Sequence, residues 1–251
     1  MSRKLSDKKR LFDAVEVPDG YFQDRDQAHK PCALCGGVSV RRIYPQAHFP
    51  VVRCRSCGLV YADEHFRDED LRGFYTGDYY QRAYVCHPKE IDAKISAAYL
   101  REFGRIDRRM PGGGRVLDFG SARGTFVQAL IDSDLASRWT PQGIDINPDE
   151  IAMGEAKGTP VRLADVFAGE VESESHEAVT AFSVLEHMQD PRATLEALRD
   201  VLVPKGKLLL IVPNGKCLII KAGLVAHHLA KDRVRGFTDN VFHEEHLYYF
   251  D

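Results

Sequence analysis

The sequence predicts an α/β protein in which a doubly wound, mostly parallel sheet follows a small N-terminal module. From residue 115 onward short apolar runs alternate with helical patterns, as in parallel sheets covered by helices on both faces. Upstream, two identical cysteine pairs mark a compact unit, and 251 residues suffice for one large core and an appendage. We therefore expect a tail at 1–28, the cysteine module at 29–65, a tyrosine-rich linker and helix at 66–110, and the main domain at 111–251.

Charge and hydropathy restrict the partners of the chain. No apolar run approaches the roughly 20 residues that span a bilayer, so no membrane partner is expected. The first ten residues are basic but lack the apolar core of a secretory signal. A formal net charge of −3 provides no electrostatic footprint for nucleic acid. These features predict a cytoplasmic protein that binds neither nucleic acid nor membrane, with a solvated N-terminal tail.

Four of the six cysteines form two C-x-x-C pairs, Cys32 with Cys35 and Cys54 with Cys57. Each pair lets two thiolates from one tight turn face a single cation, and the glycine after it supplies left-handed backbone. The sequence thus predicts a zinc ribbon with a structural Zn²⁺, because four thiolates leave no position open for catalysis. Two disulfides or redox-active pairs are the alternative, which a reducing compartment disfavours.

Residues 88–110 are predicted to form an amphipathic helix between the two units. Apolar side chains recur there at three- and four-residue steps, while charged residues occupy the other face. The apolar stripe consists of Ile91, Ile95, Tyr99, Phe103, Ile106 and Met110. Pro111 and three glycines end the helix and mark the border of the main domain.

Five strands and three clear helices are predicted beyond that border. The strands are expected at 115–119, 141–146, 160–165, 176–183 and 207–213, and the helices at 125–133, 147–157 and 190–202. The last two helices begin with Asn147-Pro148 and Asp190-Pro191, each a capping side chain followed by a proline at the first helical position. Ligands of such sheets bind outside the carboxyl ends of the strands.

The stretch "VLDFGSARGTF" at 116–126 is the first candidate ligand site. Asp118 ends an apolar strand, Gly120 permits a tight turn, and Gly124 lets the next helix start close to a ligand. Exposed amides of this turn would favour an anionic group such as a carboxylate. A dinucleotide is the competing ligand, but Ala122 and Thr125 stand where its G-x-G-x-x-G fingerprint needs glycines.

Two more acidic residues follow the next strands. Asp145 in "GIDIN" is placed to accept both hydroxyls of a ribose, and Asp165 in "LADVF" to accept from the amino group of an adenine. Each aspartate alone is equally typical of a helix cap or a turn. The ordered series of Asp118, Asp145 and Asp165 around one crevice favours a nucleoside ligand.

In these motifs the sequence resembles the class I S-adenosylmethionine-dependent methyltransferases, which have a Rossmann-like fold. "VLDFGSARGTF" is similar to their first motif, "GIDIN" to their ribose-binding strand end, "AVTAFSVLEHMQDP" to their fourth-strand motif and "LVPKGKLLLIVPN" to the turn into strand five. The resemblance covers residues 115 to about 214. It departs from the family at Ala122, where glycine is usual, and at Val179, where a carboxylate is frequent.

The resemblance implies S-adenosylmethionine as the cofactor and assigns its neighbours. Asp118 and Gly120 would lie beside the methionine part, Asp145 would hold the ribose, and Asp165 with Val166 would border the adenine. Ser183, Glu186 and His187 would line the far wall, where His187 is either a base or a structural residue. The implied cofactor-binding set is Asp118, Gly120, Ser121, Gly124, Asp145, Ile146, Asp165, Val166 and Ser183.

The C-terminal stretch "VFHEEHLYYFD" supplies candidate catalytic residues. Together with the ribbon and "FYTGDYY" it resembles sugar C-methyltransferases that act on nucleotide-linked ketosugars. The resemblance implies that Glu245 and His246 are candidate bases for the proton next to a carbonyl, with Tyr79 nearby, as are Tyr75 and Tyr249. Glu244 departs from the pattern, and similar segments occur in relatives that methylate oxygen. A surface aromatic stretch without a catalytic part is the alternative.

Two functions remain open at this point. As an enzyme, the chain would transfer a methyl group from S-adenosylmethionine to carbon or oxygen of a small-molecule acceptor. As a zinc-ribbon binding module, it would keep a degenerate methyltransferase fold. The strands that close the sheet in the family are missing after strand five, so a fragment, a homo-oligomer or a partner at the open sheet edge is expected. The intact acidic series favours the enzyme.

Overall fold

The computed structural model describes residues 29–45, 50–63, 89–218, 220, 222, 225 and 246–251. Several predictions fall on other residues: the tail at 1–28, the tyrosine-rich segment at 74–80, and the candidate catalytic residues Tyr79 and Glu245 lie outside the described residues.

The main sheet has five strands, all parallel, in the order β6-β5-β4-β7-β8. Their bounds are β4 (Gly114–Phe119), β5 (Trp139–Asp145), β6 (Val161–Leu163), β7 (His176–Phe182) and β8 (Leu202–Ile211). The five predicted strands and the predicted fold class are confirmed. β8 begins five residues before the predicted start, because Leu202 already pairs with His176 ahead of a register shift.

Helices and short 3₁₀ turns flank the strands of the main sheet. The helices are α4 (Lys89–Asp107), α5 (Thr125–Ile131), α6 (Pro148–Glu155) and α7 (Pro191–Val201); the turns are η1 (Asp134–Ser137), η2 (Val166–Ala168) and η3 (Leu185–His187). The predicted caps are confirmed: Asn147 accepts the amides of Asp149 and Glu150, and Asp190 accepts those of Arg192 and Ala193.

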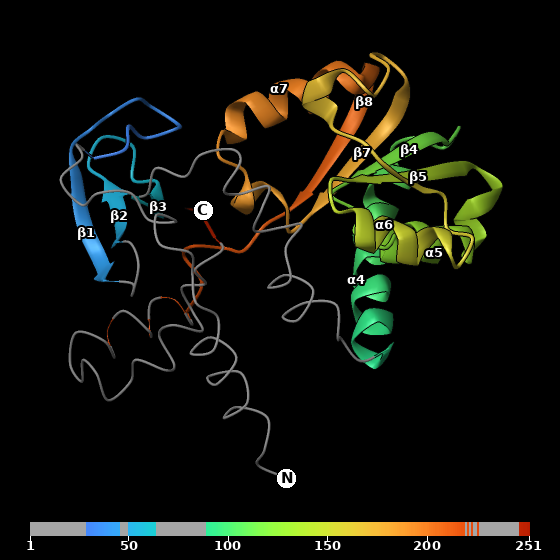
Figure 1. Cartoon of the computed structure of the whole chain (residues 1–251), viewed down its shortest axis with the longest axis horizontal. Helices are drawn as coiled ribbons and strands as arrows, with labels where there is room; N and C mark the ends of the chain where they lie inside the picture. The colour runs from blue at the N-terminus through green and yellow to red at the C-terminus, as the bar shows by residue number, and fades with distance from the viewer. Residues whose placement is uncertain are drawn as a thin grey trace, which may run out of the picture.

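The sheet carries a core on each face, as its doubly wound pattern predicts (Figure 1). Successive strand residues point to opposite faces. Val116 packs with Phe103 and Ile106 of α4 and with α5, whereas Leu117 packs with Leu198 of α7. The buried stripe of α4 therefore explains why this helix belongs against the sheet.

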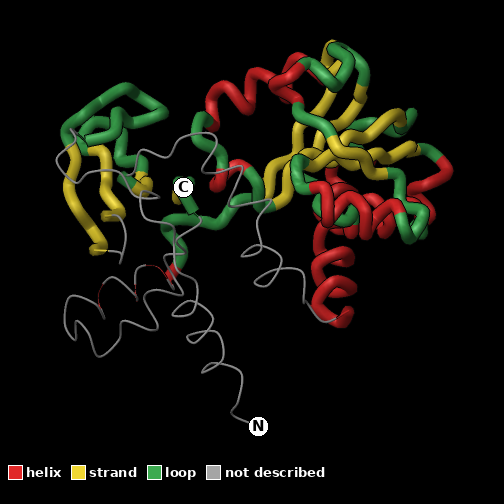
Figure 2. The backbone as a smooth tube through the Cα atoms, in the orientation of Figure 1, coloured by secondary structure: helices red, strands yellow, loops and turns green. Residues whose placement is uncertain are grey.

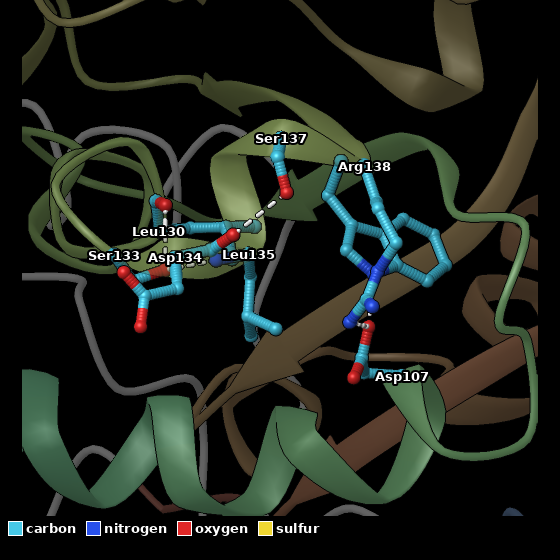
Figure 3. A network of polar contacts seen from close by, with 8 residues as sticks. Asp107, Leu130, Ser133, Asp134, Leu135, Ser137 and Arg138 are labelled. Carbon is cyan, nitrogen blue, oxygen red and sulfur yellow. Dashed lines mark hydrogen bonds and ion pairs between the residues drawn. The ribbon is translucent and has the colours of Figure 1, made fainter.

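A polar network fixes the end of α4 to the start of β5 (Figure 3). One carboxylate oxygen of Asp107 accepts from Arg138 Nη2 at 2.6 Å and from Trp139 Nε1 at 2.9 Å. Ser133 caps η1 by accepting the amide of Leu135, and its own hydroxyl donates to the carbonyl of Leu130. The network lies at the amino end of β5, so it anchors the scaffold at the opposite edge from the carboxyl ends of the strands.

The N-terminal unit is a separate antiparallel sheet in the order β1-β2-β3-β9 (Figure 2). It combines β1 (Val40–Pro45), β2 (Pro50–Cys54) and β3 (Val60–Ala62) with β9 (Tyr248–Tyr249) from the far end of the sequence. Tyr248 and Tyr249 are 1% and 2% exposed. The alternative of an aromatic surface stretch is therefore wrong for these two residues, because Tyr248 packs in a core cluster with Tyr61 and Tyr249 packs in another with Tyr44.

The segment that carries β9 also joins the two sheets, and Figure 1 shows the C-terminus lying between them. The amide of Leu247 donates to the carbonyl of Glu186 at 2.8 Å, while the Leu247 carbonyl accepts from the amide of Ala62 at 2.9 Å. Tyr248 donates its hydroxyl hydrogen to the carbonyl of Gln189. In the described part of the chain, no helix combines the length and hydropathy needed to cross a bilayer.

Candidate functional site

The carboxyl ends of β4 and β7 are the natural ligand position of this sheet. These strands are neighbours although two others lie between them in the sequence, so the direction of winding reverses there. Asp118 pairs in register with Gly143 of β5 and with Thr180 of β7, which places it in the middle of that edge. Asp145 ends β5, and Asp165 follows β6. The structure thus brings the three predicted carboxylates to the same edge of the sheet.

The turn after β4 is closed by bonds within the chain. The amides of Gly120 and Ser121 donate to the carbonyl of Ile144, and the amide of Gly124 donates to the carbonyl of Ser121. The amide of Ala122 donates to the Asp145 carboxylate at 2.8 Å. The expectation that the amides of this turn face an anionic ligand is therefore wrong for these four, because the turn uses them to hold its own shape.

Asp118 is the buried carboxylate at the carboxyl end of β4. It is 4% exposed and accepts a hydrogen bond from Thr180 Oγ1 at 2.7 Å. Burial raises the pKa of Asp118 to about 7, the hydrogen bond from Thr180 opposes that shift, and the charge of Asp145 adds to it. A cation placed beside this carboxyl would favour its ionised form.

Asp145 and Asp165 both organise nearby backbone. Asp145 accepts the amide of Asn147 at 2.9 Å in addition to that of Ala122, and burial raises its pKa against these bonds. Asp165 caps η2 by accepting the amide of Phe167 at 2.9 Å, and the adjacent Val166 is buried in the core. The turn and cap roles that either aspartate alone suggests are therefore present.

Gly120 occupies a position that no other residue fits without strain. Its φ is +69°, in the left-handed region, and a Cβ there would lie 2.5 Å from Cγ2 of Val184. The turn therefore packs directly against the residue before η3. Ala122 also has a positive φ, +47°, at the position where glycine is usual in the family that the motif resembles.

Gly120→Ala is expected to destabilise the protein by about 2–4 kcal/mol, the sum of left-handed strain and overpacking against Val184. Adding Val184→Ala should recover the steric part and leave the backbone strain. Urea unfolding of the two single variants and the double variant measures the coupling between the positions. Purely additive effects would show that the predicted contact does not exist.

Tyr99 is a residue of this edge that the sequence pattern misassigns to a purely apolar stripe. Its ring stacks on Phe182 with centroids 4.1 Å apart. Burial raises the pKa of Tyr99, its hydrogen bond with the Ser183 side chain opposes the shift, and the charges of Asp118 and Glu186 add to it. In the sequence, the one sign of this polar role is that Tyr99 carries a hydroxyl, whereas the other residues of the stripe do not.

A second cluster consists of Glu186 and His187 in η3 together with His246. The rings of His187 and His246 lie 4.9 Å apart and nearly perpendicular, and His246 also contacts the ring of Tyr249. Glu186 is fully buried, and among the described residues neither of its carboxylate oxygens has a hydrogen-bond partner. Burial raises the pKa of Glu186 to about 7. Of the predicted catalytic residues, the structure places His246 here.

The four cysteines of the N-terminal unit converge on one point. Each offers a sulfur within 4.8 Å of the others, and all four are free thiols. The Sγ atoms of Cys32 and Cys57 are 3.5 Å apart, and those of Cys35 and Cys54 are 3.6 Å apart. Four sulfurs on a tetrahedral zinc with bonds of about 2.3 Å would be separated by about 3.8 Å. The donor set and spacing fit that ion.

The two cysteine turns repeat the same backbone bonds. The amide of Gly36 donates to the carbonyl of Cys32, and that of Gly58 donates to the carbonyl of Cys54. Both glycines have the predicted positive φ, +71° and +86°. The amides of Cys57 and then Ser56 lower the pKa of the Cys54 thiol to about 6, although burial opposes this. Amide donors directed at sulfur are typical of thiolates that bind a metal.

Comparison with known proteins gives a family match over most of the chain. Residues 89–251 match a family model described as a methyltransferase domain. A comparison with curated proteins finds no match.

Among solved structures, the PH0226 protein from Pyrococcus horikoshii OT3 is similar at 19% identity and a TM-score of 0.44, over 53% of this chain and 65% of that one. This chain therefore covers less than two thirds of that structure's length. An S-adenosylmethionine-dependent methyltransferase from Mesorhizobium loti is similar at 20% identity and a TM-score of 0.36, over 45% and 53% of the two chains. By the match of its residues 89–251, the chain belongs to the methyltransferase-domain family.

Proposed function

We propose that the protein transfers the methyl group of S-adenosylmethionine to carbon or oxygen of a small molecule. The observation that carries this proposal is the placement of Asp118, Asp145 and Asp165 at one edge of the sheet of a methyltransferase-family chain. The cofactor's sulfonium supplies an electrophilic methyl group. The chain therefore has to bind the cofactor and the acceptor, align the acceptor's nucleophile with the methyl carbon, remove the acceptor's proton and exclude water.

The proposed cofactor contacts follow from the positions of these residues at the carboxyl ends of the strands. The Asp118 carboxylate would face the cationic methionine end, and Gly120 and Ser121 would let the backbone approach it. Asp145 would accept the ribose hydroxyls while it keeps Ala122 in place. Asp165 and Val166 would border the adenine. The proposed set is completed by Gly124, Ile146 and Ser183.

The proposed acceptor side lies beside η3. There the amide of Leu247 donates to the carbonyl of Glu186, and the ring of His246 lies 4.9 Å from that of His187. His246 is the described candidate for removing the acceptor's proton, and Glu245 and Tyr79 are proposed to act with it. The resemblance of the C-terminal motif supports a nucleotide-linked sugar as the acceptor class.

The N-terminal unit is proposed to be a ribbon that holds one structural Zn²⁺ through Cys32, Cys35, Cys54 and Cys57. Support comes from the convergence of the four sulfurs. β9 pairs with β3 and its preceding residue bonds to Glu186, so the ribbon would hold His246 in position. This arrangement favours a ribbon that completes an enzyme over an independent binding module.

Titration calorimetry with S-adenosylmethionine tests the proposed function. The parent protein is expected to bind one equivalent, and Asp145→Ala to bind at least tenfold more weakly, because two charge-assisted hydrogen bonds to the ribose are lost. Asp200→Ala is the matched control, since Asp200 pairs with Arg199 at an exposed position outside the crevice. Absence of heat from folded parent protein would refute the cofactor assignment.

A further inference from the structure

The buried carboxylate of Glu186 accepts no hydrogen bond from the residues that the structure describes. Its side chain is 0% exposed, and neither oxygen accepts a hydrogen bond from a described residue. A carboxylate in that state costs several kcal/mol unless a proton or a cation neutralises it. The groups around Glu186 therefore determine which of the two is favoured.

Two imidazoles face this carboxylate. His187 Nε2 lies 3.9 Å from Glu186 Oε1, and one ligand atom from each of Glu186, His187 and His246 lies within 4.8 Å of the other two. A metal with bonds of about 2.1 Å separates neighbouring ligand atoms by about 3.4 Å, so side-chain shifts of about an ångström close the set. Leu247, the residue after His246, is held in place because its amide donates a hydrogen bond to the carbonyl of Glu186.

We propose that Glu186, His187 and His246 bind a second divalent transition-metal ion, separate from the ion of the ribbon. Two imidazoles and one carboxylate form a donor set that suits Zn²⁺ and related ions and leaves at least one coordination position open. The ribbon differs in this respect, because its four thiolates fill the coordination shell.

The site lies at the carboxyl end of β7, because β7 ends at Phe182 and η3 begins at Leu185. If the proposed function holds, the open position would take an oxygen of the methyl acceptor. A hydroxyl bound to a divalent cation releases its proton more readily, so the ion would acidify the acceptor. His246 would then contribute as a ligand, and an acceptor with a hydroxyl or carbonyl oxygen next to the methylated atom is the class that fits.

Metal stoichiometry tests this inference without any turnover. After exposure to Zn²⁺ and removal of the excess, native mass spectrometry is expected to show two ions per parent chain and one ion in Glu186→Gln and in His246→Asn. His29→Asn and Glu196→Gln are matched controls at exposed positions outside both clusters, and both should keep two ions. One ion in the parent, or equal counts in parent and cluster variants, would overturn the proposal.

Titration of the metal-free parent with Co²⁺ covers the case in which a variant does not fold. The first equivalent should develop the sulfur-to-cobalt charge-transfer absorption of the ribbon. A second equivalent should add only the weaker visible bands of a nitrogen and oxygen site. Saturation at one equivalent would reject the second site. Because neither experiment contains S-adenosylmethionine, a negative result here leaves the calorimetric test of the proposed function intact.

Discussion

Cys54→Ser is expected to abolish zinc binding at the four-cysteine cluster and to unfold the N-terminal unit. Cys54 ends β2 and is 1% exposed, and its sulfur faces that of Cys35. Structural zinc sites contribute apparent binding free energies of about 10–16 kcal/mol to the folding of small modules. A serine hydroxyl replaces a thiolate ligand poorly, so most of that free energy should be lost. Loss of the sulfur-to-cobalt absorption and of a cooperative thermal transition would record the effect.

Cys217→Ser is the matched control for that substitution. Cys217 is partly buried beside Tyr249 and its neighbours and lies outside the four-sulfur cluster. It should retain the cobalt absorption and the parent's thermal transition. If Cys54→Ser and Cys217→Ser behave alike, or if a chelator leaves the parent unchanged, the ribbon does not depend on a metal.

Cofactor affinity is expected to fall about tenfold between pH 8 and pH 6. The pKa of Asp118 is raised to about 7 by burial, and the cationic end of S-adenosylmethionine requires its ionised form. With that pKa, the ionised fraction drops from about nine tenths at pH 8 to about one tenth at pH 6. Binding near pH 7 should therefore release about half a proton. Calorimetry in buffers of different ionisation enthalpy measures this release.

Asp118→Asn should separate binding from folding. Because the folded-state pKa lies above the ordinary value of 3.8, the native chain binds more protons than the unfolded chain between about pH 4 and pH 7. The free energy of unfolding of the parent thus falls as pH rises through that window. The variant has no carboxyl group at position 118, so this loss does not occur in it. At pH 8 Asp118→Asn should be about 1–3 kcal/mol more stable than the parent yet bind the cofactor at least tenfold more weakly. A variant that retains the parent's pH dependence of binding would remove Asp118 from this role.

Local signals in the sequence were sufficient for most of the main domain. The alternation of apolar runs and helical patterns defines the five strands, and Asn147-Pro148 and Asp190-Pro191 mark two helix starts, because caps depend on bonds between near neighbours. The two C-x-x-C pairs with their glycines likewise predict two matching turns. Parallel strands place their carboxyl ends together, so the gathering of three aspartates was also predictable.

Contacts between distant segments could not be obtained from local pattern. β9 joins the ribbon across the whole main domain, and its preceding residue bonds to Glu186, which only the folded chain decides. From the sequence, the amides after β4 are expected to be available to a ligand. In the folded chain they donate hydrogen bonds to the Ile144 carbonyl and the Asp145 carboxylate of the neighbouring strand β5. In the sequence, Tyr99 belongs to an apolar stripe. Only in the folded chain is Ser183 close enough to affect the pKa of its hydroxyl.

The sequence by itself thus determined the strands of the main sheet and the helices between them, the order of the aspartates and the two cysteine turns, since these features depend on residues close together along the chain. The tertiary structure alone decided which groups are buried together, including the carboxylate of Glu186, which accepts no hydrogen bond from the described residues, and the two imidazoles near it. The physical reason is that burial and long-range hydrogen bonding depend on what packs around a residue, and its sequence neighbours do not record that.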